Sequence, residues 1–200
     1  LINNGIDKGD ILEFGSGTGK HGRLLAEKGY NVHGIELSQE MIDLADTNER
    51  FTCQQGDICN TKLDKKFDSV ISLFHVMSYQ VSNKNLESVF LNASHHLDPG
   101  GIFLFDFWYT PAVYNFNPSV RVKRMKDDMT EITRIAEPDI HVNENRVDVN
   151  YTIYSENLEN GEINSFKESH EMRHFSLPEI DILANISGFT RVSANEFLTA

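Results

Sequence analysis

A glycine-rich segment near the start of the chain carries the strongest chemical signal. Ile11 to Phe14 is typical of a buried strand, and Gly15-Ser16-Gly17-Thr18-Gly19 follows it directly. Glycine permits a sharp turn and close ligand approach because it has no Cβ. The spacing differs from Gly-x-Gly-x-x-Gly, which places a pyrophosphate on a helix N-terminus. Glu13 would repel a pyrophosphate and would suit the ammonium of an amino-acid moiety, although a solvated residue at the strand end is the alternative.

Two later carboxylates follow predicted strands. Glu36 lies about 20 residues after the glycine loop, where an acid can accept hydrogen bonds from both hydroxyls of a ribose. Dinucleotide-binding folds share this feature, so Glu36 alone does not discriminate. Asp57 and Ile58 follow the third strand, where the acid could accept from an adenine amino group and the apolar residue could pack on its ring. The alternative for Asp57 is a surface residue of a loop turn.

The first 107 residues alternate between short apolar runs and amphipathic segments, which indicates parallel βαβ units. In the helix 20–28 we expect Leu24 and Leu25 on the apolar side. Ser38 is a good N-cap for the helix 39–48, which would bury Met41, Ile42 and Leu44. We predict a turn at 99–101. The predicted strands are 11–14, 31–37, 51–54, 67–74 and 102–107, and the predicted helices are 20–28, 39–48 and 85–97.

The pattern changes after residue 119. Alternating apolar residues over 147–153 indicate a half-exposed antiparallel strand, and Asn160-Gly161 forms a turn before a strand over 163–175. A capping box at Ser176 starts a helix that ends at Gly188, and 189–197 reads as a last strand. Only ten residues precede the first predicted strand, so we expect the sequence to be a fragment of a longer protein.

Composition narrows the class of partner. The chain has 200 residues and a net charge of −12, which does not favour a nucleic-acid partner. The short basic run over 121–126 is interpreted as a charged edge strand that resists aggregation. No apolar stretch suggests a membrane span and no signal peptide opens the chain, so we expect a cytoplasmic protein. Cys53 and Cys59 fit no metal or redox motif, and the histidines predict no zinc site.

These features in this order resemble the class I S-adenosylmethionine-dependent methyltransferases, and the Asp98-Pro99-Gly100-Gly101 segment fits that family too. The resemblance implies an α/β fold with a Rossmann-like, mostly parallel seven-stranded sheet. The resemblance further implies that residues 1–200 form a single domain. An antiparallel β layer inserted at 116–175 is expected to form part of the acceptor site. The resemblance also implies S-adenosylmethionine as the cofactor. The expected cofactor-binding residues are Glu13, Gly15, Ser16, Gly17, Gly19, Glu36, Leu37, Asp57, Ile58, Leu73 and Phe74.

A narrower resemblance links the chain to the N-methyltransferases of nucleotide-linked amino sugars. It rests on Phe105-Asp106-Phe107-Trp108-Tyr109 with Pro111, on the inserted layer, and on Glu168-Ser169-His170 before Phe175. The chain departs from that group where Tyr79 stands in place of a histidine, and it lacks the group's N-terminal helix. We expect His75, Tyr79 and His170 as catalytic candidates, and Trp108, Tyr109 and Glu168 as residues that bind a small-molecule acceptor.

Several functional alternatives stay open. The acceptor group could be an amine, a hydroxyl or a carboxyl. A nicotinamide oxidoreductase would need the other glycine spacing, and a non-catalytic S-adenosylmethionine-binding module would need a blocked acceptor pocket. Asn-Pro-Pro-Tyr, typical of enzymes that methylate a flipped base, does not follow the fourth strand. The oligomeric state is left open, with a homodimer as one option.

Overall fold

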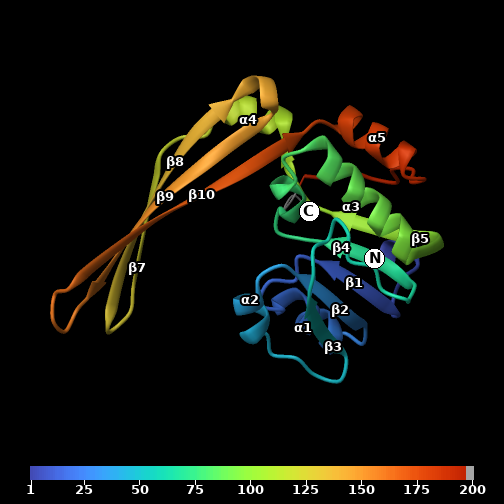
Figure 1. The fold of residues 1–200 in the computed structure, drawn as a ribbon, viewed down its shortest axis with the longest axis horizontal. Coiled ribbons are helices and arrows are strands. Elements are labelled where there is room, and N and C mark those ends of the chain that lie inside the picture. Colours follow the sequence, from blue (N-terminus) through green and yellow to red (C-terminus); the bar gives the residue numbers. More distant parts are fainter. Residues whose placement is uncertain (197–200) are drawn as a thin grey trace. The chain divides into compact units, whose positions relative to one another are not determined.

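The computed structural model describes residues 1–196, and it divides into two compact units. Unit 1 comprises residues 1–107 together with the segment from Leu177 onward, and unit 2 comprises Trp108–Ser176. Both units appear in Figure 1.

Unit 1 is built on a parallel five-stranded sheet of order β3-β2-β1-β4-β5. All five predicted strands of this sheet are present, although the fourth ends at residue 72 instead of 74 and the fifth covers 97–105 instead of 102–107. They place the carboxyl ends of β1, β2 and β4 at one edge of the sheet (Figure 1). The order reverses direction between β1 and β4, and ligands of such sheets bind outside the carboxyl ends at this point. The strands are β1 (Asp10–Phe14), β2 (Asn31–Glu36), β3 (Phe51–Gln55), β4 (Phe67–Ser72) and β5 (Leu97–Phe105).

Helices pack on both faces of this sheet, as a parallel sheet requires. On one face, α1 packs Ala26 and the following Tyr30 against Ile11, Val32 and Phe51. On the other face, His96 of α3 contacts the Phe14 ring edge-on. The helices are α1 (Lys20–Glu27), α2 (Gln39–Asp43), α3 (Asn83–His96) and α5 (Leu177–Ile186), with 3-10 turns η1 (Ile2–Asn4) and η2 (Val76–Tyr79).

Two helix predictions need correction. The helix after Ser38 ends at Asp43 instead of Asn48, and none of its residues is buried. Met41 and Leu44 are 46% and 73% exposed, and Ile42 is half-buried. The buried residues of α1 are Gly22 and Ala26, whereas Leu24 is exposed. Glycine explains the second correction: a Cβ on Gly22 would lie 2.4 Å from the Phe51 ring, so α1 approaches the sheet through its smallest residue.

Two strand boundaries also differ from the predictions. The Pro99-Gly100-Gly101 segment lies inside β5, where a register shift against Phe67–Ser69 of β4 accommodates it as a bulge. Residues 190–196 form no strand. The end of that predicted strand, Phe197, lies outside the described residues.

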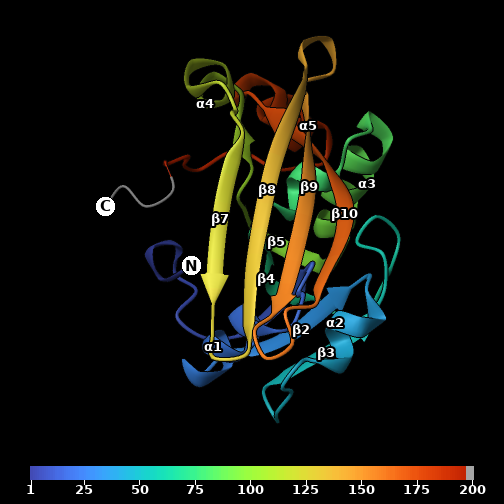
Figure 2. The same ribbon diagram turned by 90° about the vertical axis from the view of Figure 1, so that its left-hand side faces the viewer.

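Unit 2 is a second five-stranded sheet of order β6-β10-β9-β8-β7. Long antiparallel pairings join β7 with β8, β8 with β9 and β9 with β10 (Figure 2). The short β6 pairs in parallel with β10. Because β7 lies at the edge, the position predicted for the basic run is confirmed. The elements are β6 (Trp108–Tyr109), α4 (Thr110–Phe116), β7 (Arg121–Lys126), β8 (Thr130–His141), η3 (Val142–Glu144), β9 (Arg146–Asn157) and β10 (Ile163–Phe175).

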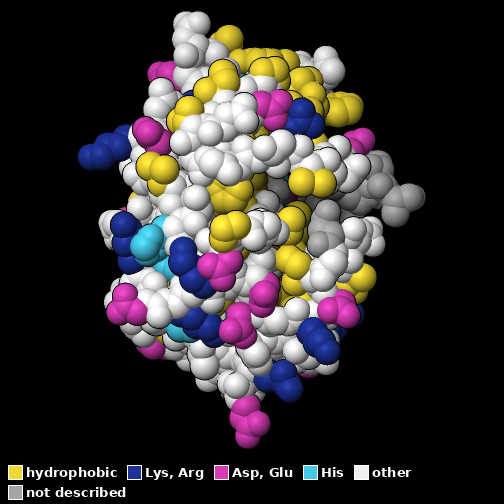
Figure 3. Space-filling model, turned by 90° about the vertical axis from the view of Figure 1, so that its right-hand side faces the viewer, with side chains coloured by type: hydrophobic (Ala, Val, Ile, Leu, Met, Phe, Trp, Pro, Cys, Tyr) yellow, Lys and Arg dark blue, Asp and Glu magenta, His cyan; other side chains and the backbone are white. Residues whose placement is uncertain are grey.

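A small apolar cluster stabilises unit 2. Val113 of α4 packs with Val147, Val149 and Met172, and Trp108 lies against them. The sheet beyond this cluster carries charged and exposed side chains. On the face of the molecule drawn in Figure 3, Lys and Arg side chains alternate with Asp and Glu side chains, so positive and negative charges are mixed there.

Candidate cofactor and active site

The glycine loop of unit 1 turns back over the end of β2. Gly15, Gly17 and Gly19 all have positive φ angles, of 71°, 56° and 76°, which glycine adopts without the steric cost of a side chain. A Cβ on Gly15 would lie 2.6 Å from Val76, and one on Gly19 would lie 2.3 Å from the Phe51 ring. A Cβ on Gly17 would approach only the sulfur of Met41, at 3.9 Å. Gly17 is therefore the loop glycine whose backbone is open to a ligand.

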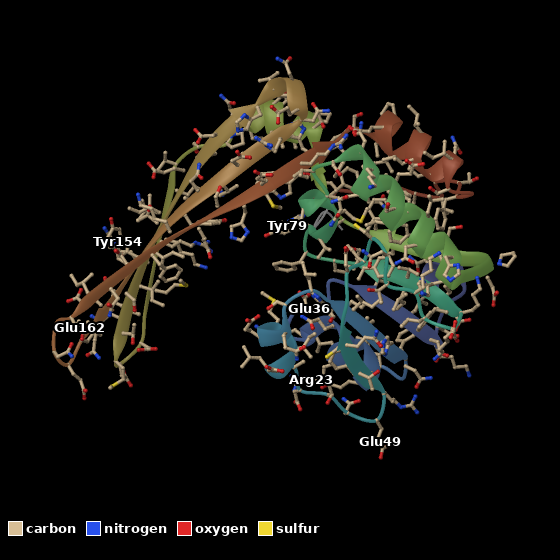
Figure 4. All side chains as sticks on the ribbon, viewed as in Figure 1. Arg23, Glu36, Glu49, Tyr79, Tyr154 and Glu162 are labelled. Atoms are coloured by element: carbon tan, nitrogen blue, oxygen red, sulfur yellow. The ribbon has the colours of Figure 1, made fainter. Side chains whose placement is uncertain are left out.

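Glu36 lies beside this open glycine. Its Oε2 accepts a hydrogen bond of 2.8 Å from the Gly17 N–H, and its Oε1 accepts one of 3.0 Å from the Ser38 N–H. These two donors fix the carboxylate at the carboxyl edge of the sheet, where Figure 4 labels Glu36. A carboxylate has about four acceptor positions, so acceptor capacity for hydroxyl groups remains.

Glu13 is buried beneath the loop, with a side chain 1% exposed. The alternative of a solvated strand-end residue is therefore wrong. Its Oε1 lies 3.7 Å from the Nδ1 of His21 at the start of α1. Burial raises the pKa of Glu13 to about 8, and the nearby Glu36 carboxylate adds to this rise, while the Gly22 N–H opposes it.

The chain is strained directly after β4. Phe74 and His75 both have positive φ angles, of 66° and 64°, although neither is glycine. Asp106, which follows β5, accepts a hydrogen bond of 2.8 Å at Oδ1 from the His75 N–H. Its Oδ2 lies 3.7 Å from the imidazole Nδ1 of His75. The carboxylate thus holds this unusual backbone, and the Phe74 ring is left 72% exposed.

Further predicted residues of unit 1 lie along the same edge with different surroundings. Leu37 is exposed, and Tyr79 is half-exposed on η2, where Figure 4 labels it. Leu73 packs against the interior cluster on the α1 side of the sheet. The buried hydroxyl of Ser16 lies over Gly34, where any Cβ would be 2.5 Å from it.

Asp57 and Ile58 have local structural roles in this structure. Asp57 accepts at Oδ1 from the Cys59 N–H and at Oδ2 from the Asn60 amide, both within the same turn. Ile58 is buried, and its carbonyl accepts from the Asn92 amide of α3. Their contacts to an adenine stay a prediction.

The remaining candidates belong to unit 2. Trp108 and Tyr109 form β6, which pairs with His174 and Phe175 at the end of β10. Glu168 and His170 lie further along β10, 3.5 Å apart between Oε1 and Nε2. The His170 ring also contacts the edge of Tyr151.

The sequence interpretation missed two residues of unit 1. His21 lies near the Glu13 carboxylate and its ring is 5.7 Å from that of Phe74, so it joins the loop to the segment after β4. Asp106 positions His75. A signal for Asp106 was available, because a carboxylate at the carboxyl end of a parallel strand is a site candidate.

Comparison with known proteins agrees with this geometry. Residues 11–101 match the profile of a family described as a methyltransferase domain. The matched residues lie in unit 1 and include the glycine loop and Glu36, where the sequence predicts that S-adenosylmethionine binds.

Among curated proteins, the chain is 26% identical over 146 residues to a dTDP-3-amino-3,4,6-trideoxy-alpha-D-glucopyranose N,N-dimethyltransferase of Streptomyces venezuelae, covering 72% of this chain and 60% of that protein. It is 25% identical over 182 residues to a dTDP-3-amino-3,6-dideoxy-alpha-D-glucopyranose N,N-dimethyltransferase of Streptomyces fradiae, covering 90% and 69%. The chain thus spans less than two thirds of the first relative's length. A solved sugar N-methyltransferase from Streptoalloteichus shares the fold, with a TM-score of 0.83 at 18% identity, covering 93% of this chain and 74% of that one.

The residues present fit this cofactor. The open face of Gly17 leaves room for a ligand beside a fixed carboxylate that suits ribose hydroxyls. Exposed apolar side chains of Leu37 and Phe74 flank the same edge, as a ring-bearing ligand requires. Within residues 1–196, no cluster of three or more His, Cys, Asp and Glu side chains is arranged to hold a metal ion. The helices of this range are also too short or too polar to span a membrane.

A separate groove of about 540 Å³ lies toward the amino ends of β1–β4, away from this edge. It is lined by Asp10, His33, Thr52 and Lys65, among others. His33 Nδ1 lies 2.8 Å from the Thr52 hydroxyl, and burial lowers the pKa of His33. None of the residues that line this groove belongs to the glycine loop, so the groove is distinct from the candidate cofactor site.

Proposed function

We propose that the protein transfers a methyl group from S-adenosylmethionine to a small-molecule acceptor, the amine of a nucleotide-linked sugar. The observation that carries this proposal is the Glu36 carboxylate, held by the Gly17 N–H beside the open face of that glycine. The printed names of two relatives, both dTDP-amino-sugar N,N-dimethyltransferases, support the acceptor class. We further propose that the whole protein has the seven-stranded sheet of its class, with residues 116–175 as an inserted layer that contributes to the acceptor site.

The roles proposed for unit 1 follow from its contacts. Glu36 accepts from the ribose hydroxyls, and Gly15, Ser16, Gly17 and Gly19 form the wall along the methionine part. Glu13 lies under this wall, and the ammonium of the amino-acid moiety would favour its ionised form over the protonated form that burial favours. Leu37, Leu73 and Phe74 flank the cofactor with apolar surface. Asp57 and Ile58 hold the adenine.

The acceptor residues must align a nucleophile and take up one proton. S-adenosylmethionine, when bound, supplies an electrophilic methyl group on a sulfonium, so alignment and exclusion of water are the main tasks of the protein. An amine must arrive deprotonated, and a modest general base suffices to take the proton that it loses. His75 and Tyr79 at the end of β4 and His170 on β10 are the proposed groups for this, with Trp108, Tyr109 and Glu168 as acceptor contacts.

Titration calorimetry with S-adenosylhomocysteine tests the cofactor site first. We expect micromolar binding by the parent chain and its loss in Glu36→Ala. Glu49→Ala is the matched control, because Glu49 is an exposed glutamate of the same unit that Figure 4 places away from Glu36. Equal binding by both variants would contradict the role of Glu36.

A transfer assay then tests the acceptor. Labelled S-adenosylmethionine is offered with a dTDP-linked amino sugar and with the same sugar carrying a hydroxyl in place of the amine. Transfer to the amino sugar alone supports N-methylation. Transfer to the hydroxyl sugar would contradict N-methylation and would show that the protein is an O-methyltransferase.

A further inference from the structure

The two faces of the sheet β7–β10 in unit 2 differ in the balance of their charges. Directly opposed residues of antiparallel strands project to the same face, so the register assigns every side chain to a face. The face that carries Lys123, Arg134, Tyr151 and Phe166, here called the cationic face, has one carboxylate in the paired segments, Glu168. The opposite face carries cations and carboxylates in similar number, and Lys126 and Arg146 form salt bridges there. Its cations are Arg124, Lys126, Arg146, Lys167 and Arg173, and its carboxylates are Glu131, Glu137, Asp139, Asp148, Glu156 and Glu171.

The cations of the cationic face lie close together, and none of them has a salt-bridge partner among the described residues. Lys123 is directly opposite Arg134, and Arg121 is two residues from Lys123 on the same strand face. Like charges directly opposite in a sheet are destabilising, and a protein of net charge −12 has many carboxylates that could have been placed beside them. These cations are therefore available to an anion supplied from outside the chain.

Aromatic side chains lie beside the cations on the same face, where they could contact the base of a nucleotide. The Arg134 guanidinium lies 5.0 Å from the centre of the Tyr151 ring, which limits the positions open to its donors. Phe166 is 55% exposed and occupies the same cross-strand row as Arg134, with Ile153 between them. Two strand spacings separate them by about 10 Å. A guanidinium suits a phosphate, and an exposed ring suits a base.

We propose that the cationic face binds the diphosphate of the nucleotide-linked acceptor through Arg134 and Lys123, with Phe166 available to the base. This inference rests on the proposed function and names the part of the substrate that unit 2 recognises. Figure 2 shows the four strands side by side. The diphosphate carries the negative charge that the three cations lack within the chain.

The test is titration with thymidine 5′-diphosphate, thymidine and inorganic pyrophosphate. Lys123→Gln and Arg134→Gln should each weaken thymidine diphosphate binding roughly tenfold to a hundredfold, the range for hydrogen bonds to charged groups. Arg124→Gln is the matched control: it removes one charge from the same exposed edge strand but on the other face, and should change affinity by about twofold or less.

The outcomes separate this inference from the proposed function. Binding of pyrophosphate and thymidine diphosphate, but not of thymidine, supports a diphosphate site, and tighter binding of the nucleotide supports contact with the base. Equal losses in Lys123→Gln and Arg124→Gln, or no binding of thymidine diphosphate by the parent, would overturn it. S-adenosylhomocysteine binding should be unchanged in all three variants. A parent chain that fails to bind S-adenosylhomocysteine would instead count against the proposed function.

Discussion

The Asp106 carboxylate accepts a hydrogen bond of 2.8 Å from the backbone N–H of His75, so the residue after β5 fixes the backbone after β4. Two adjacent non-glycine residues, Phe74 and His75, are held in the left-handed region there. Each such residue costs on the order of 1–2 kcal/mol, and the strain persists only where the surroundings enforce it. Asp106 is the group that enforces it beside the candidate active site.

We predict that Asp106→Ala releases this segment. Loss of the acceptor should lower the free energy of unfolding by roughly 1–3 kcal/mol and weaken S-adenosylhomocysteine binding, because the exposed Phe74 ring is no longer held in place. Urea unfolding and calorimetry measure the two effects. Asp98→Ala, at an exposed position of β5, the strand that Asp106 follows, is the control. Unchanged binding in Asp106→Ala would show that the segment keeps its conformation without the carboxylate.

Two alanine substitutions in the glycine loop should separate binding from folding. Gly17→Ala places a methyl group in open space, so its cost to folding is about 1–2 kcal/mol from the positive φ alone, whereas ligand binding should fall strongly. Gly19→Ala drives its methyl group into the buried Phe51 ring and should destabilise the fold by roughly 2 kcal/mol or more. Thermal unfolding with and without S-adenosylhomocysteine distinguishes them. A Gly17→Ala variant that binds as the parent does would place the ligand elsewhere.

Glu13 should make the protein less stable as pH rises toward 8. Burial raises its pKa from 4.5 to about 8, so between these values the native state binds more protons than the unfolded state, and stability falls with increasing pH. The loss is on the order of a few kcal/mol. Glu13→Gln should abolish this part of the pH dependence in urea unfolding at pH 5 to 8. Glu27→Gln, at an exposed position in α1, should leave it in place.

His96 should confer the opposite sensitivity, to acid. Its Nδ1 lies 2.8 Å from the Asn92 carbonyl and its Nε2 lies 2.9 Å from the Leu63 N–H, so the ring donates at one nitrogen and accepts at the other and must be neutral. Burial lowers the pKa of His96 below its ordinary 6.5. Below about pH 6.5 the unfolded state therefore binds more protons, and stability falls with decreasing pH.

Amide hydrogen exchange of Leu63 measures this effect directly. Exchange should accelerate as the pH is lowered from 7 to 5, after correction for the intrinsic rate, because protonated Nε2 cannot accept. His96→Gln should alter this response, whereas His33→Gln, which changes a second histidine whose pKa burial lowers, should retain it. A Leu63 amide that stays equally protected at pH 5 would contradict the assignment.

The sequence by itself determined the strands of unit 1 and the class of cofactor that its glycine loop is expected to bind. Apolar runs of strand length and a glycine-rich loop are local features, so the five strands and the loop could be predicted from them. The long strand β10 was also predicted, because alternation and an Asn-Gly turn are local too. Ser38 was correctly identified as a cap, since its side chain reaches only to Met41.

Tertiary structure decided what depends on partners distant in the chain. Leu24 and Leu44 are exposed because Gly22 lets Phe51 approach α1 and because α2 ends early, neither of which periodicity reveals. The burial of Glu13, the clamp of Asp106 on His75 and the pairing of Lys123 with Arg134 join residues from separate elements. Such contacts depend on strand order and register. A sequence pattern specifies which face of an element is apolar, but the partner that it meets is chosen only when the elements pack.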